Sequence, residues 1–140
     1  MDNEILILKF GVDGEQFALK VSDIQEVNRV PEILPAKGNN KSITGFINLH
    51  GKIVPVVSDK DVYDVKSQGM KKDLFIALKT KNSPVCILVD ELAGFQRINN
   101  TADNENIQTK NGQKYSETIF SETGRMFSLI DTDYFTLEDR

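Results

Sequence analysis

Two segments of this sequence recur later in the chain, in the same order. Residues 53–59 resemble residues 126–132, and residues 17–24 match residues 85–92 in their apolar pattern. One such match could arise by chance between any two β-hairpins, but the shared order of both pairs argues against chance. The repeat predicts two related half-domains, because a strand-turn-strand unit buries its apolar face against units of the same kind.

At 140 residues the chain is long enough to bury its own core, as one domain or as two small, closely packed subdomains. Its net charge of -4 argues against nucleic acid, whose binding depends on lysine and arginine side chains that neutralise phosphates. No apolar run approaches the length of a membrane span, and the first residues lack the basic start of a signal peptide. We therefore expect a cytoplasmic protein without direct membrane insertion.

Alternating apolar residues between turn residues predict mainly β structure. The expected hairpins are residues 5–10 with 16–21, residues 46–49 with 53–57, and residues 74–78 with 85–89, before a last strand pair within residues 115–130. Polar residues 64–72 are expected to connect the halves, and residues 99–114 are too polar to add much core.

A short helix is expected after the first hairpin. Ser22 and Gln25 have the spacing of a capping box, in which each side chain bonds the backbone amide of the other residue at a helix start. This helix would run to about Asn28, with Ile24 and Val27 on one face. The alternative is an irregular bend between strands.

Three residues in the predicted hairpins have special backbone requirements. Gly51 can adopt the positive φ angle that a tight turn demands, and Gly124 holds the same place before the last strand. Pro55 has no amide hydrogen to donate, so its strand is expected to lie at a sheet edge or to carry a bulge there.

Groups that could support catalysis are few. His50, the single histidine, lies at a hairpin tip, and Cys86, the single cysteine, lies in an apolar run and cannot form an internal disulfide. We expect His50 to be an exposed turn residue or an ion-pair partner; a general-base or metal-ligand role is the alternative. We expect Cys86 to face the core or a neighbouring strand and not to be a reactive thiolate.

Two acidic pairs close β segments at equivalent places in the halves: Asp59 with Asp61, and Asp131 with Asp133. This symmetry is typical of turn residues more than of cation ligands. The sequence has no phosphate-binding glycine loop, nucleophile elbow or paired CxxC motif. We therefore predict no catalytic residue, no metal and no cofactor. A binding surface is expected where the segment around Glu26 meets residues 45–51, in a groove that an amphipathic helix would suit.

The most specific pattern in the chain is Gly45-x-Ile47-Asn48-Leu49-x-Gly51, followed by Pro55-Val56-Val57. Weaker patterns keep a fixed order around it, in residues 17–27, 87–92 and 124–130. In this order and spacing the chain resembles the CheW-like chemotaxis coupling proteins over almost its whole length.

The resemblance implies a single CheW-like domain over residues 1–140, built of two packed, SH3-like, five-stranded β-barrels with one or two short helices. The first barrel is expected at about residues 5–64 and the second at about residues 73–137, with strands that the two can share.

The resemblance also implies function. Members of the family are non-enzymatic adaptors that couple the cytoplasmic helical tip of a chemoreceptor (a methyl-accepting chemotaxis protein) to the regulatory domain of a CheA-type histidine kinase. A cytoplasmic adaptor of this kind is recruited to membrane-associated receptor arrays. The alternatives are a CheW-like module that serves another signalling or motility system, or a divergent auxiliary coupler.

A receptor-binding groove between the barrels is implied as well. Its expected residues are Ile24, Glu26, Val27, Gly45, Asn48 and His50. The family usually has an arginine at the position of His50, and this arginine pairs with the glutamate that corresponds to Glu26. We therefore predict that Glu26 and His50 approach each other at the groove rim, although a histidine reaches less far and is ordinarily charged only below about pH 6.5.

Overall fold

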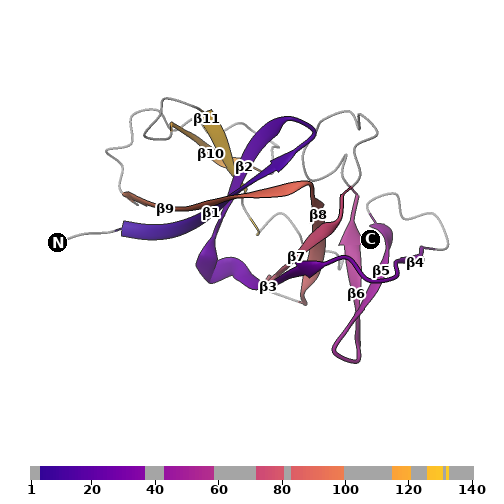
Figure 1. Ribbon diagram of the computed structural model, residues 1–140. Coiled ribbons are helices and arrows are strands. Elements are labelled where there is room, and N and C mark those ends of the chain that lie inside the picture. Colours follow the sequence, from indigo (N-terminus) through magenta and orange to yellow (C-terminus); the bar gives the residue numbers. More distant parts are fainter. Residues whose placement is uncertain are drawn as a thin grey trace.

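The computed structural model describes residues 4–36, 43–58, 72–80, 83–99, 115–120, 126–130 and 132. Nearly all of these residues lie in β-strands, which form two sheets (Figure 1). The predicted mainly β fold with two packed β subdomains is confirmed.

Among the described residues, the first half of the chain contributes six strands: β1 (Glu4–Val12), β2 (Glu15–Lys20), β3 (Ile24–Arg29), β4 (Leu34–Pro35), β5 (Ile43–Leu49) and β6 (Lys52–Val57). The second half contributes five: β7 (Leu74–Leu78), β8 (Val85–Val89), β9 (Glu91–Asn99), β10 (Tyr115–Phe120) and β11 (Met126–Ile130). The three hairpins predicted from alternation and turn residues are confirmed as β1–β2, β5–β6 and β7–β8.

The two sheets combine strands from both halves of the chain. The five-stranded sheet has the order β10-β11-β2-β1-β9, and the six-stranded sheet has the order β3-β7-β8-β6-β5-β4. Each half thus places its opening hairpin in the sheet that the other half completes, and Figure 1 shows β9 running along β1. Each sheet therefore contains strands from both expected subdomain ranges, residues 5–64 and residues 73–137.

Strand registers reproduce the sequence repeat. Leu8 pairs with Leu19 in the first hairpin, and Ile76 pairs with Ile87 at the equivalent place in the β7–β8 hairpin. The parallel pairings between the halves agree too, because β2 lies beside β11 as β8 lies beside β6. The molecule is therefore built from two copies of one strand arrangement, as the repeat predicted.

The prediction of a helix that starts at Ser22 is wrong. A 3-10 turn, η1 (Val21–Asp23), leads directly into β3, which pairs with β7. The register skips Gln25, and such a bulge adds one residue to a strand. Ile24 and Val27 therefore point to the same face of the strand although they are three residues apart. The same spacing places two residues on one face of a helix, which is why the sequence pattern resembled a helix.

Strand β9 carries the same bulge at the equivalent place, where the register with β1 skips Ala93. Leu92 and Phe95 therefore share one face of β9, as Ile24 and Val27 share one face of β3. The two pairs differ in burial. Ile24 and Val27 pack against the core, whereas Leu92 and Phe95 are exposed, and Phe95 retains 66% of its accessible surface.

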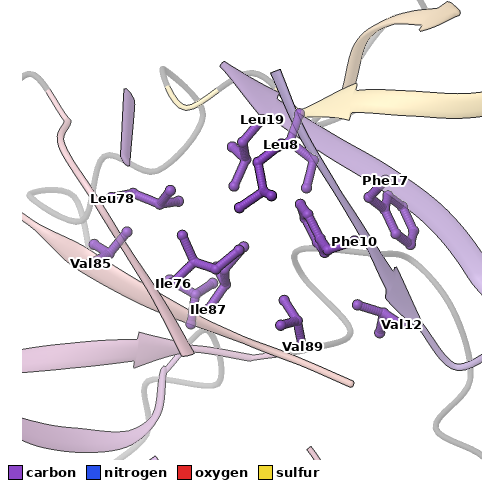
Figure 2. Packing of buried hydrophobic residues seen from close by; sticks show 12 residues of the cluster. Leu8, Phe10, Val12, Phe17, Leu19, Ile76, Leu78, Val85, Ile87 and Val89 are labelled. Atoms are coloured by element: carbon purple, nitrogen blue, oxygen red, sulfur yellow. The ribbon is translucent and has the colours of Figure 1, made fainter. Parts of the chain in front are cut away.

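The buried apolar residues form three clusters, of which only the central one joins the two sheets. The central cluster lies between the two sheets: Leu8, Phe10, Val12, Phe17, Leu19, Val57, Ile76, Leu78, Val85, Ile87, Val89 and Ile130. Figure 2 shows its side chains from β1 and β2 meeting those from β7 and β8. The outer cluster of the six-stranded sheet comprises Ile47, Leu49, Val54, Val56, Phe75, Ala77 and Cys86. The outer cluster of the five-stranded sheet comprises Ile7, Ala18, Ile98, Phe127 and Leu129.

Two hairpin turns use positive φ angles at both central residues, the pattern of a type I′ turn. Asp13 and Gly14 have φ angles of 51° and 86°, and His50 and Gly51 have φ angles of 54° and 89°. The prediction for Gly51 is confirmed. Gly124 lies outside the described residues.

Pro55 is not on an edge strand, because β6 lies between β8 and β5. A bulge does occur nearby, but on the partner strand, where the register between β5 and β6 skips Thr44. Pro55 itself pairs with Phe46 in regular register, and β6 meets β8 at a single pair, Val56 with Cys86. The short contact with β8 leaves room for a residue that cannot donate a ladder hydrogen bond.

Candidate functional site

Glu26 and His50 are in direct contact, as predicted. The distance from His50 Nε2 to Glu26 Oε1 is 2.7 Å. The His50 side chain retains 74% of its accessible surface and the Glu26 side chain 22%, so the pair lies at the protein surface. An imidazole this open is not enclosed in a ligand pocket, which disfavours the general-base alternative for His50.

The β5–β6 turn fixes the position of His50. Asn48 Oδ1 accepts a hydrogen bond of 2.9 Å from the amide of Gly51, which closes the turn around the histidine. The φ angle of His50 is positive, a conformation that histidine adopts more readily than bulky or β-branched residues do. Two residues of the predicted site, Asn48 and His50, therefore belong to one hairpin tip, which Gly51 helps to close.

The bulge in β3 fixes the position of Glu26. Register pairs Glu26 with Ala77 on β7, and Ala77 with Cys86 on β8, so the three residues form one row across the sheet. Cys86 is fully buried, as predicted. Burial raises the pKa of its thiol to about 12, and the nearby Glu26 carboxylate adds to this rise. The thiol is therefore neutral, and Glu26 lies above a small, apolar row of side chains.

The Glu26–His50 contact shows that the six-stranded sheet is curled. In the sheet order, β7 and β8 separate β3 from β6, so in a flat sheet β3 and β6 would lie roughly 14 Å apart. Side chains stand nearly perpendicular to a sheet and cannot bridge that gap along it. Val30 and Ile33, which follow β3, also pack against the outer cluster of this sheet. The β3 edge and the β5–β6 hairpin therefore face each other.

The structure does not bring all six predicted groove residues together. Val27 pairs with Ile76 of the central cluster, whereas Glu26 pairs with Ala77 of the outer cluster. Ile24 and Val27 thus lie on the opposite face of β3 from Glu26, where both are half-buried.

Gly45 was expected in the groove, but it is buried. A Cβ atom at this position would lie 2.5 Å from the carbonyl oxygen of Leu34 and 2.7 Å from Cγ2 of Ile33. The glycine therefore allows residues 33–34 to cross β5 closely. In this chain the absence of a side chain at Gly45 permits this packing.

The sequence analysis did not identify a group of exposed and half-buried apolar residues on β4, β5 and β6. Ile53, which is 56% exposed, pairs with Asn48, and Leu34, Phe46 and Pro55 form a neighbouring cross-strand row. In the other half of the chain the pair equivalent to Phe46 and Pro55 is polar, since Thr118 pairs with Ser128, whereas the pair equivalent to Asn48 and Ile53 is apolar, since Phe120 pairs with Met126. The difference at Phe46 and Pro55 was the signal that could have identified this row, because the other half of the chain shows that the fold does not require apolar residues at these two positions.

A buried ionic cluster was also missed. Lys72 Nζ lies 3.3 Å from both carboxylate oxygens of Asp13 and 3.9 Å from Oδ1 of Asp90. Asp90 Oδ2 accepts a hydrogen bond of 2.6 Å from the amide of Asp13. The cluster joins the β1–β2 turn to the chain segments beside β7 and β8, so it supports the fold at a distance from the exposed pair.

In the ranges that the structure describes, no three histidine, cysteine, aspartate or glutamate side chains gather closely enough to hold a metal ion. In the same ranges, no helix has the length and apolar character needed to cross a membrane. The acidic pairs at Asp59 and Asp61 and at Asp131 and Asp133 lie outside the described residues.

The chain is similar to known proteins over nearly its whole length. The family model of the CheW-like domain matches residues 6–137. The chemotaxis protein CheW of Thermotoga maritima is 31% identical over 131 residues, which cover 93% of this chain and 86% of that protein. The crystal structure of the scaffolding protein TtCheW from Thermoanaerobacter tengcongensis has the same fold, with a TM-score of 0.80, 20% sequence identity, and coverage of 100% of this chain and 97% of that one. This chain belongs to the CheW-like domain family.

Proposed function

We propose that this chain is a non-enzymatic adaptor that couples the cytoplasmic helical tip of a chemoreceptor to the regulatory domain of a CheA-type histidine kinase. The observation that carries the proposal is the family match over residues 6–137. The likeness to a protein named for chemotaxis supports it. In this role the chain works in the cytoplasm, at membrane-associated receptor arrays.

The receptor-binding surface that we propose is centred on Glu26 and His50. Asn48 and the exposed Ile53 lie on the same β5–β6 hairpin as His50, so this hairpin presents polar, ionisable and apolar groups near its tip. A receptor helix that carries an apolar stripe with polar flanks matches such a surface. Ile24 and Val27 extend it onto the other face of β3, and Gly45 supports it from below.

Binding measurements with purified partners test this proposal. The wild-type chain is expected to bind both a receptor-tip fragment and the regulatory domain of the kinase in calorimetry, and to join them in one complex. Glu26→Ala and Ile53→Asp should each weaken receptor binding about tenfold or more, the range of a central interface residue. The matched control is Glu15→Gln, which changes an exposed residue next to the β1–β2 turn in the other sheet and should bind normally.

A specific observation favours a second candidate. His50 replaces the arginine that the resemblance implies at this position, so the chain is also a candidate for a divergent coupler with a different partner. Binding of the kinase domain without binding of any receptor tip would support this alternative. Binding of neither partner would contradict the coupling proposal.

A further inference from the structure

The Glu26–His50 contact joins two parts of the six-stranded sheet that the strand order separates. β3 forms one edge of this sheet, and the β5–β6 hairpin lies beyond β7 and β8. We propose that Glu26 and His50 form a proton-sensitive clasp that sets how firmly the β5–β6 hairpin is held against β3. The inference concerns regulation of the surface proposed above, and it rests on that proposal only for its effect on partner binding.

Both ends of the clasp are positioned in advance. Glu26 follows the bulge at Gln25, and His50 lies in a turn that the Asn48–Gly51 hydrogen bond closes. The five-stranded sheet has the same bulge, but the residue equivalent to Glu26 is Gly94, which has no side chain. The repeated architecture therefore does not require this contact. It is an addition to one sheet only.

Protonation changes the strength of this contact. A neutral imidazole can give the Glu26 carboxylate an ordinary hydrogen bond, whereas an imidazolium gives a charge-assisted bond that is roughly twice as strong. Histidine is the side chain whose ordinary charge change falls between about pH 5 and 8. The chain has a single histidine, so a histidine signal reports on this contact alone.

Other ionisable groups on the surrounding elements do not duplicate this behaviour. They are Arg29 on β3, Glu32 on the segment after it, Lys52 on β6 and Cys86 on β8; β7 carries none. Burial keeps the Cys86 thiol neutral in this range, since its pKa is raised to about 12. Side chains of the other three types ordinarily keep their charge between about pH 5 and 8. The clasp is therefore expected to tighten as the imidazole gains its proton and to loosen as the proton is lost.

Nuclear magnetic resonance can test the clasp without any partner. The ring signals of the single histidine give the pH at which the imidazole titrates, and amide hydrogen exchange gives protection factors corrected for the intrinsic pH dependence of exchange. The amides of the β5–β6 hairpin should be about two- to fivefold better protected on the acid side of this titration, the range of an exposed ion pair. Amides of the β1–β2 hairpin serve as the internal reference and should not follow the titration.

Four variants separate the clasp from a general effect of pH. Glu26→Gln and His50→Asn should abolish the pH dependence, and asparagine tolerates the positive φ angle of this turn position. His50→Arg should keep the hairpin protected on both sides of the titration. Lys52→Gln, a charge change in the same hairpin, should behave as the wild-type chain does. The proposal would be overturned if protection of the β5–β6 amides in the wild-type chain did not change across the histidine titration. It would also be overturned if this protection still changed with the titration in Glu26→Gln.

Receptor binding tests the functional consequence separately. The affinity of the wild-type chain for a receptor-tip fragment should change about two- to fivefold between about pH 5.5 and about pH 8, and the affinity of His50→Arg should stay constant. If no variant binds a receptor tip at either pH, the coupling proposal fails, while the exchange experiment still decides whether the clasp exists. If the tip binds with a pH-independent affinity, the coupling proposal stands and the regulatory role of the clasp is refuted.

Discussion

The ammonium group of Lys72 lies within 3.3 Å of both carboxylate oxygens of Asp13. Asp13 belongs to the turn of the first hairpin, and Lys72 lies just before β7, the first strand of the second half. The Lys72 side chain is only 5% exposed, so the pair is shielded from water. It ties the opening hairpins of the two halves together at the end of the central cluster.

Lys72→Met should strongly destabilise the fold. The change leaves the buried carboxylates of Asp13 and Asp90 without their cation, and breaking a buried ion pair in this way costs about 3–5 kcal/mol. The free energy of unfolding in urea measures the loss. Lys79→Met, which changes an exposed lysine next to β7, is the matched control and should stay within about 0.5 kcal/mol of the wild-type value. Equal stability of the two variants would show that the cluster is not a structural tie.

Gly45→Ala should destabilise the protein by about 1–3 kcal/mol, the usual cost of forcing extra volume into a packed site. The added Cβ would meet the carbonyl oxygen of Leu34 at 2.5 Å, and a backbone atom cannot move aside as a flexible side chain can. Thermal unfolding followed by circular dichroism measures the effect. Thr44→Ala, at the preceding exposed position of β5, provides the comparison and should change little. A neutral result for Gly45→Ala would mean that residues 33–34 do not cross β5 this closely.

The thiol of Cys86 should make stability depend on pH in the alkaline range. An unfolded cysteine ionises near about pH 8.5, whereas burial holds the folded pKa at about 12. Between these values the unfolded state has lost a proton that the folded state keeps, so the thiol's contribution to stability is complete at neutral pH and falls from about pH 9 upward. As pH rises, the unfolding free energy of the wild-type chain should therefore fall relative to that of Cys86→Ala. A difference that stays constant from about pH 7 to 11 would contradict this prediction.

Phe10→Ala should destabilise both sheets together, because Phe10 lies in the cluster that joins them. Truncation of a buried phenylalanine costs about 3–5 kcal/mol. Denaturant unfolding should remain a single transition when followed by probes on each sheet. Ile53→Ala removes an exposed side chain of β6 and is expected to leave stability nearly unchanged. Separate transitions for the two sheets would show that the central cluster does not couple them.

The sequence predicted local structure well wherever a residue type or a residue pattern is compatible with only one backbone conformation. Gly51 identified a tight turn, and alternation of apolar residues identified the hairpins on either side of it. The prediction failed at Ile24 and Val27, because a strand with a bulge and a helix both place residues three apart on one face. No local pattern distinguishes the two, and pairing with β7, which lies far away in the sequence, decides for the strand.

The candidate site was predictable only in part. The resemblance suggested that Glu26 and His50 meet, and their side chains are in contact. It also placed Ile24, Val27 and Gly45 in the same groove. The bulge places Ile24, and ordinary strand alternation places Val27, on the opposite face of β3 from Glu26, and residues 33–34 cover Gly45, so a receptor contact at these three residues stays a prediction. The buried cluster around Lys72 had no signal at all, since its members lie in three separate turns and segments of the chain.

The sequence by itself determined the two-fold repetition, the hairpins and their turns, because these depend on residues that are neighbours along the chain. Only the tertiary structure decided which strands join which sheet, how far the six-stranded sheet curls and which side chains meet across it. The two halves carry similar apolar patterns, so a hairpin of either half could pair with strands of either half. Packing of the whole central cluster decides which strands pair, and this cluster combines residues from both halves of the chain.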